Sequence, residues 1–214
     1  MTLALLVWFG GGGCALAGAN VRTGRESVVT KLDAATRARI SGVSWHPGCP
    51  VGLDDLRLVT VTFVGFDSAD HVGELIVHRS VAANVALTFD ELYRAKFAFA
   101  QIRLVDDFGA DDDRSTLANN TSAFNCRAAE GSTRWSAHAY GEAIDINPLQ
   151  NPYVYADGHV LDPAAKTFVD RSKVRTGMIT TDGPVVKAFA RIGWGWGGRW
   201  RTTKDYQHVS ARGH

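Results

Sequence analysis

The chain has 214 residues, of which 45% are hydrophobic and 21% are charged. These proportions are typical of a globular domain and exclude an intrinsically disordered chain. Lys plus Arg number 23 and Asp plus Glu number 22, giving a formal net charge of +1, so we expect no nucleic-acid partner. No feature implies a stable protein partner. The length suffices for one well-buried core, and we predict a single domain over residues 27–214.

The N-terminal segment, residues 1–26, is expected to be an export leader or a disordered tail. Met1–Ala19 carries no charge, and its apolar run Leu3–Phe9 is too short for a membrane span, which takes about 20 residues. Ala15–Ala17 fits a signal-peptide cleavage site, although a positive n-region is missing. Lipid modification of Cys14 is an alternative. We therefore expect a protein that is secreted or attached to the cell envelope.

Beyond this segment, hydrophobic periodicity predicts strands and helices in blocks. In chain order they are a helix in Lys31–Ile40, strands at Leu56–Phe66 and Gly73–His78, a helix at Val81–Phe97, a strand at Ile102–Val105, an acidic loop at Asp106–Asp113, a polar stretch at Asn119–Arg134, a strand at Glu142–Ile146, a loop-rich insertion at Asn151–Thr180, a helix at Gly183–Ile192 and a strand at Tyr206–Ser210. This order favours an α+β fold with a small antiparallel sheet flanked by helices.

The cysteines allow one disulfide. If Cys14 is removed or lipidated, Cys49 and Cys126 remain as an even pair. A disulfide between them would suit an oxidising compartment, and two free buried thiols are the alternative. No Cys-x-x-Cys pair is present, which argues against a cysteine-rich zinc site.

Two short motifs carry side chains suited to a catalytic metal. A catalytic zinc ion takes three protein ligands and keeps a fourth position open. His138 and Asp145 are ligand types within one segment, and Gly141 lets the chain turn between them. The later run Asp205-Tyr206-Gln207-His208 offers a third ligand.

The pattern Ser-x-His-x-x-Gly-x-Ala-x-Asp, followed by Asp-x-x-His, resembles the M15 family of zinc D-Ala-D-Ala carboxypeptidases and cell-wall endopeptidases. Flanking runs are similar to its VanY-like branch, and the resemblance extends over about Leu53 to Ser210. These runs are Val105–Phe108, Asn119–Asn125, Asp145–Pro148 and Gly193–Gly198. The resemblance implies a Hedgehog/D-Ala-D-Ala-peptidase-like fold, with Zn²⁺ held by the ligands His138, Asp145 and His208.

The resemblance also implies the proton-transfer chemistry. Zinc lowers the pKa of bound water to about 7, and Asp205 would act as the general base that passes the proton to the leaving amine. Aspartate in place of glutamate at position 205 favours the endopeptidase-like members of the family. An arginine upstream of the first ligand would stabilise the tetrahedral intermediate. We predict Arg103 for this role, with Arg127 and Arg134 as alternatives.

Several polar and aromatic residues are candidates for substrate binding. They are Ser136, Ser122, Asn125 and Trp196, the last with Trp194 and Trp200 as a substrate wall. Loop capping is the alternative for Ser122 and Asn125, and core packing for the tryptophans. Ser136 could instead be the nucleophile of a metal-free serine hydrolase.

Other clusters receive a structural interpretation. A second metal site at His71 and His78 is one interpretation, but packing or strand-edge roles are favoured. Asp111–Asp113 could bind calcium, although a solvated acidic loop is the simpler interpretation. His46, His159 and His214 carry no spacing signal.

The sequence therefore predicts a zinc-dependent peptidase that acts on peptidoglycan stem peptides, at a terminal D-Ala-D-Ala bond or an internal bond such as L-Ala-D-Glu. The alternative is a non-catalytic zinc-containing cell-wall binding domain. Such a domain would not need a general base, so Asp205 favours the enzyme.

Overall fold

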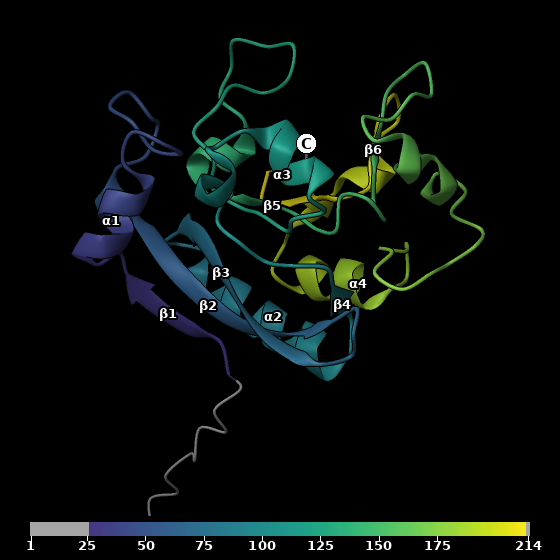
Figure 1. Cartoon of the computed structure of the whole chain (residues 1–214), viewed down its shortest axis with the longest axis horizontal. Coiled ribbons are helices and arrows are strands. Elements are labelled where there is room, and N and C mark those ends of the chain that lie inside the picture. Colours follow the sequence, from purple (N-terminus) through teal and green to yellow (C-terminus); the bar gives the residue numbers. More distant parts are fainter. Residues whose placement is uncertain (1–25, 213–214) are drawn as a thin grey trace, which may run out of the picture.

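The structure is a computed structural model that describes residues 26–212. The predictions made for residues 1–25, including lipid modification of Cys14, lie outside the described residues, as does His214. Figure 1 shows the main sheet beside helix α2, with the smaller sheets on the other side of the molecule.

The main sheet consists of antiparallel β1, β2 and β3, in that order, with the short β4 pairing parallel to β2. Their bounds are β1 Val28–Lys31, β2 Leu56–Gly65, β3 Asp70–His78 and β4 Ala98–Phe99. Along β2, the buried Val59, Val61 and Phe63 alternate with half-buried threonines, as expected of a strand with one face on the core. The predicted strands Leu56–Phe66 and Gly73–His78 are confirmed.

The described residues form four α-helices around the main sheet and the smaller sheets. They are α1 Ala34–Ile40, α2 Ala82–Arg94, α3 Asp112–Leu117 and α4 Pro184–Arg191. The buried face of α2 contains Val85, Phe89 and Leu92, at the spacing of an amphipathic helix. Phe89 meets Phe189 of α4 edge to face, with 6.4 Å between ring centroids. The core thus joins α2, the main sheet and α4, and the three predicted helices are confirmed.

The predicted strand Ile102–Val105 is wrong. Only Ile102 forms an isolated bridge, with Thr121, and a 3-10 helix begins at Val105. The reason is a side chain that takes the place of a strand partner. Asn120 accepts from the backbone N–H of Arg103 and donates to its carbonyl, both at 3.0 Å. The backbone of this segment is therefore satisfied without a sheet ladder.

The acidic segment Asp106–Asp113 is also not the loop that we predicted. It contains the 3-10 helix Val105–Phe108 and the start of α3. Asp111 accepts from the backbone N–H of Arg114 at 3.0 Å, so an acidic side chain forms the N-cap of α3. The sequence analysis also missed strand β1.

The second half of the chain contains the two smaller sheets. Antiparallel β5 (Ala143–Asp145), β9 (His208–Ser210) and β7 (Gly195–Trp196) form one, with β9 in the middle. The other pairs β6 (Tyr153–Val154) with β8 (Lys204–Asp205). The remaining 3-10 helices are Leu53–Asp55, Ala137–Tyr140, Pro163–Phe168 and Gly197–Arg199. The predicted α+β fold with small antiparallel sheets is confirmed.

Cys49 and Cys126 form a disulfide, with 5.9 Å between their Cα atoms. It lies beside a small apolar cluster that includes Leu32, Ile40 and Phe124. The bond therefore ties the first part of the chain to the segment that precedes the candidate site.

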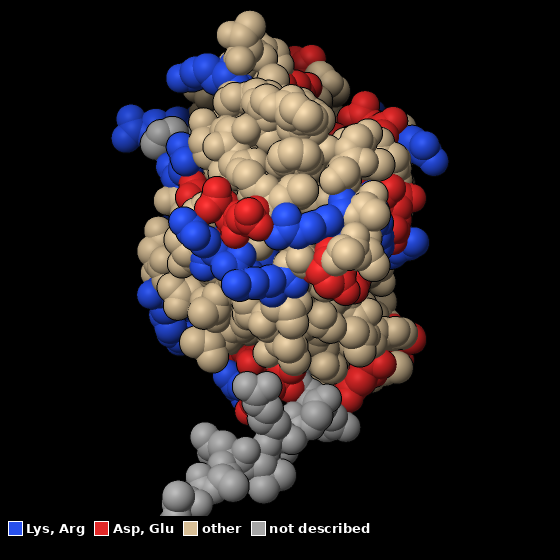
Figure 2. All heavy atoms as spheres, turned by 90° about the vertical axis from the view of Figure 1, so that its left-hand side faces the viewer, with Lys and Arg blue, Asp and Glu red and all other residues tan. Residues whose placement is uncertain are grey.

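The surface that carries α1 mixes charges of both signs. Figure 2 shows Lys and Arg side chains interspersed with Asp and Glu on this face. Arg39 pairs with both Glu74 and Asp107, at 2.7 Å each. Among residues 26–212, no helix has the length and apolar character needed to cross a membrane.

Candidate metal centre

The structure brings His138, Asp145 and His208 together as one His-Asp-His cluster. Nε2 of His138 lies 3.2 Å from Oδ2 of Asp145 and 3.3 Å from Nδ1 of His208. That Nδ1 lies 3.1 Å from Oδ1 of Asp145. All three side chains are at least 90% buried, with residue exposures of 4%, 6% and 7%. The facing ligand atoms are close enough to hold one metal ion.

Strand pairing explains how two of these residues meet. Asp145 ends β5 and His208 begins β9, and they are directly paired in the antiparallel register. Side chains of directly paired residues point to the same face of a sheet. The register thus places a carboxylate and an imidazole side by side, although they are 63 residues apart in sequence.

A short 3-10 helix, Ala137–Tyr140, supplies His138. Ser136 caps it, since its Oγ accepts from the backbone N–H of His138 at 3.3 Å. Gly141 ends the helix with a φ of 66°, and a Cβ at this position would lie 2.6 Å from the backbone N of His78. The tight turn between His138 and Asp145 therefore needs glycine, which adopts the left-handed conformation readily and has no Cβ.

A backbone carbonyl orients the His138 ring. Nδ1 of His138 lies 2.6 Å from the carbonyl oxygen of Ala123, which can only accept, so this nitrogen carries the proton. Nε2 then presents its lone pair to the cluster. Metal-binding histidines are typically held by such a bond on the other ring nitrogen.

The electrostatics of the cluster favour an ionised carboxylate. Burial acts to raise the pKa of Asp145, but His138 and His208 outweigh it and hold that pKa far below its ordinary value. Burial acts to lower the pKa of His138, and Asp145 outweighs it so that the net shift is upward. The buried negative charge of Asp145 therefore attracts positive charge to this point.

Asp205 is a second buried carboxylate beside the cluster. Its exposure is 7%, and its Oδ1 has no hydrogen-bond partner within residues 26–212. Burial raises the pKa of Asp205 to about 7, and the negative charge of Asp145 acts in the same direction. The backbone of Gly197 approaches closely, since a Cβ there would lie 2.5 Å from the carbonyl oxygen of Asp205.

The cluster and Asp205 open into one cavity of about 1160 Å³, the main cavity. Ser136 lies on its wall, and so do Arg127 and Arg134. Arg127 pairs with Asp112, with 2.7 Å between Nη2 and Oδ2.

Arg103 does not line the main cavity. Its side chain is half exposed and pairs with Asp107, with 2.7 Å between Nη2 and Oδ2, while its guanidinium lies over the ring of Phe108. Of the three arginines considered from the sequence, the two alternatives therefore line the cavity and the first choice does not.

Ser122 and Asn125 do not line the main cavity, but they form hydrogen bonds with the backbone of the cluster residues. Ser122 exchanges two backbone hydrogen bonds with Asp145, at 2.9 and 3.1 Å. Asn125 donates to the carbonyls of His138 and Ala110, from its backbone N–H and its Nδ2 respectively. Both therefore hold the backbone of the cluster residues.

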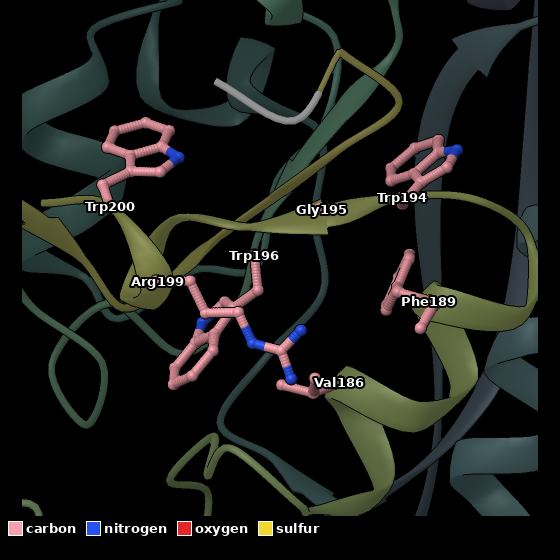
Figure 3. A pocket seen from close by; sticks show the side chains of 8 residues that line it. Val186, Phe189, Trp194, Gly195, Trp196, Arg199 and Trp200 are labelled. Carbon is pink, nitrogen blue, oxygen red and sulfur yellow. The ribbon is translucent and has the colours of Figure 1, made fainter.

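Trp196 lines a different hollow, the aromatic pocket, with Trp194, Phe189 and Arg199 (Figure 3). Its Nε1 donates to the carbonyl of Tyr206 at 2.8 Å. Trp200 borders both cavities, and its ring centroid lies 5.6 Å from that of His208. Of the three tryptophans, only Trp200 reaches the main cavity.

The other histidine and aspartate hypotheses find structural partners. His71 pairs with Asp67 and His78 with Ser80, near opposite ends of β3, so they do not form one site. In the described part of the chain, the other candidate metal group is His46 with Cys49 and Cys126, whose sulfurs are joined in the disulfide.

Sequence reasoning assigned no role to several residues of the main cavity. They include the aromatic residues Trp135, Tyr153 and Tyr155, and the amide Gln207. Gln207 stood inside the second motif, and its neighbours Asp205 and His208 were the signal that could have found it. Trp135 directly follows the polar stretch, and Tyr153 and Tyr155 lie in the insertion, where no periodicity indicates which side chains face inward.

The comparisons with known proteins bear on this segment. Residues 130–211 match the M15 family model described as D-alanyl-D-alanine carboxypeptidase. No curated protein and no solved structure matches the chain. The matched residues include the whole His-Asp-His cluster, Ser136 and Asp205. The predicted resemblance is therefore confirmed over residues 130–211, where the chain is similar to the M15 family of peptidases.

Proposed function

We propose that the protein is a zinc-dependent peptidase that hydrolyses peptide bonds in the stem peptides of peptidoglycan. One observation carries the proposal. The buried His-Asp-His cluster shares a cavity with Asp205, a buried carboxylate whose Oδ1 has no partner among the described residues. A metal site needs only the first of these features, whereas hydrolysis needs both.

The separations between the ligand atoms fit zinc. Ligands of a tetrahedral zinc ion at about 2.0–2.1 Å lie about 3.3–3.4 Å apart. Nε2 of His138 and Nδ1 of His208 lie 3.3 Å apart, and they lie 3.2 and 3.1 Å from Oδ2 and Oδ1 of Asp145, respectively. Two imidazoles and one carboxylate are also a common donor set for catalytic zinc, with the fourth position left to water or substrate. His138, Asp145 and His208 would therefore hold the ion.

When bound, zinc supplies a water of lowered pKa and polarises the scissile carbonyl. Asp205, which lines the same cavity, would accept a proton from the attacking water and return it to the leaving nitrogen. Burial raises the pKa of Asp205 in the metal-free protein, which would make it a better proton acceptor than an exposed carboxylate. Arg127 and Arg134 line the cavity and Arg103 does not, which supports one of these two arginines as the cation that would stabilise the developing negative charge.

The family description supports peptidoglycan peptides as the substrate class. The main cavity, at about 1160 Å³, exceeds the roughly 300–1,000 Å³ usual for small-molecule sites. This volume supports binding of a stretch of stem peptide that is longer than a terminal dipeptide. The Cys49–Cys126 disulfide supports action outside the cytoplasm, where such bonds persist.

Mass spectrometry of products released from intact peptidoglycan tests the proposal. Loss of D-alanine and cleavage between earlier stem residues give different product masses, so one experiment identifies the bond. We expect release by the wild type and none by His138→Ala. His46→Ala serves as the control, because His46 is exposed and lies outside the main cavity. Zinc and muropeptide binding without any release would instead favour the non-catalytic binding domain.

A further inference from the structure

Gln207 presents a buried amide oxygen that nothing in the described structure satisfies. The residue is 8% exposed and lines the main cavity. Its Oε1 has no hydrogen-bond partner among residues 26–212. An amide oxygen that is removed from water without a replacement donor is destabilising, so a rotation of this side chain that turns Oε1 toward a donor in the main cavity would be favourable.

The backbone at Gln207 is held in place by a hydrogen bond from the residue that directly follows β5, the strand that carries Asp145. The chain bends at Tyr206 and Gln207, between β8 and β9. The Gln207 carbonyl accepts from the backbone N–H of Ile146 at 3.0 Å. Because of the bend, Asp205, Gln207 and His208 all line the cavity.

The neighbouring Tyr206 shows that this orientation is specific. Its ring packs against Trp196 and lies under the guanidinium of Arg171, and it is not part of the cavity wall. Gln207 thus stands between Asp205 and His208 in the sequence, and it lines the same cavity as both.

The unsatisfied atom determines the chemistry of its partner. Oε1 of glutamine can only accept a hydrogen bond, so the incoming group must be a donor. A peptide substrate carries N–H groups on both sides of the scissile bond. We propose that Gln207 is a substrate-binding residue whose Oε1 accepts a hydrogen bond from the backbone N–H of a peptide linkage flanking the scissile bond. This inference rests on the proposed peptidase function.

Peptides in which one amide is replaced by an ester test which backbone N–H donates to Gln207. Once the cleaved bond is known, two synthetic stem peptides replace one flanking amide each by an ester, which removes its N–H and keeps its length. They are compared with the all-amide peptide on the wild type and on Gln207→Met, which keeps the side-chain size and removes the amide. We expect kcat/KM of the all-amide peptide to fall about tenfold in the variant, the size of one net hydrogen bond.

The decisive measurement is whether the effect of Gln207→Met on kcat/KM depends on which amide of the peptide is replaced by an ester. For the ester peptide that lacks the bonded N–H, Gln207→Met should lower kcat/KM by less than about twofold, because the interaction is already absent. Gln207→Glu, which keeps an accepting oxygen, should discriminate between amide and ester as the wild type does. Gln101→Met is the matched control, since Gln101 bonds the carbonyl of Ala118 and does not line the main cavity.

The outcomes separate this inference from the function on which it rests. A wild type that releases nothing from any stem peptide refutes the peptidase. A wild type that cleaves the all-amide peptide, with equal losses on Gln207→Met for all three peptides, refutes the contact alone. If Gln207→Met does not fold or retain metal, the Gln207→Glu comparison decides, and loss of its amide–ester discrimination overturns the proposal.

Discussion

Replacing Gly141 with alanine should damage both the fold and the metal site. Gly141 has a φ of 66° and ends the helix that carries His138. An alanine in this left-handed conformation costs about 1–2 kcal/mol. Its Cβ would also lie 2.6 Å from the backbone N of His78 and 3.0 Å from the carbonyl carbon of Val77. These backbone atoms belong to β3, which is paired along its length with β2, so they cannot move aside as a side chain would.

Gly131 offers a matched control. Its φ is 65°, and a Cβ there would meet nothing within 4 Å. Gly131→Ala should therefore lower the free energy of unfolding only by the cost of the left-handed conformation, about 1–2 kcal/mol. Gly141→Ala should lose about 3 kcal/mol or more, because overpacking adds about 1–3 kcal/mol. The difference between the two variants isolates the steric clash.

Urea unfolding of the metal-free proteins measures these losses, and zinc titration measures the effect on the site. We expect Gly141→Ala to weaken zinc binding about 10–100-fold, as displaced supporting contacts do, and Gly131→Ala to leave it unchanged. Equal losses of unfolding free energy in the two variants would refute the steric reasoning. Unchanged zinc affinity in Gly141→Ala would refute the claim that this turn positions His138.

Further predictions concern Asp205 and the disulfide. Asp205→Asn should retain zinc and lower kcat about 10²–10⁴-fold, since it removes general acid–base transfer; undiminished turnover would exclude Asp205 from the reaction. The pKa of Asp205 in the folded, metal-free protein is about 7, above the ordinary 3.8. The metal-free wild type should therefore lose stability relative to Asp205→Asn as the pH rises from about 4 through 7. The same pH dependence of the free energy of unfolding in both proteins would contradict the burial argument. The double variant Cys49→Ser, Cys126→Ser should lose about 4 kcal/mol, because the bond closes a loop across 77 positions; a change below about 1 kcal/mol would show that the crosslink constrains the unfolded chain little.

The sequence predicted the identity of the cluster but not how its members meet. Ligand types and motif spacing identified His138, Asp145 and His208. The pairing of Asp145 with His208 across β5 and β9 could not be read from strands of three residues each, because such short segments carry no register signal.

The errors have equally local causes. Ile102–Val105 has the apolar character of a strand, but the side chain of Asn120 satisfies its backbone at Arg103. Strand β1 is exposed along its whole length, so it lacks the alternation on which strand prediction depends. Arg103 was chosen for its position in sequence, whereas the cavity wall combines loops whose arrangement no linear pattern specifies.

The central claim is that His138, Asp145 and His208 hold a zinc ion that is required for peptide hydrolysis. The most direct test measures muropeptide hydrolysis by the same preparation before chelation, after chelation and after zinc is added back. We predict loss of hydrolysis with the metal, recovery at one equivalent of zinc per chain, and no recovery in His138→Ala. Hydrolysis that persists in the metal-free protein would contradict the claim and favour a nucleophile of the chain itself, with Ser136 as the first to replace.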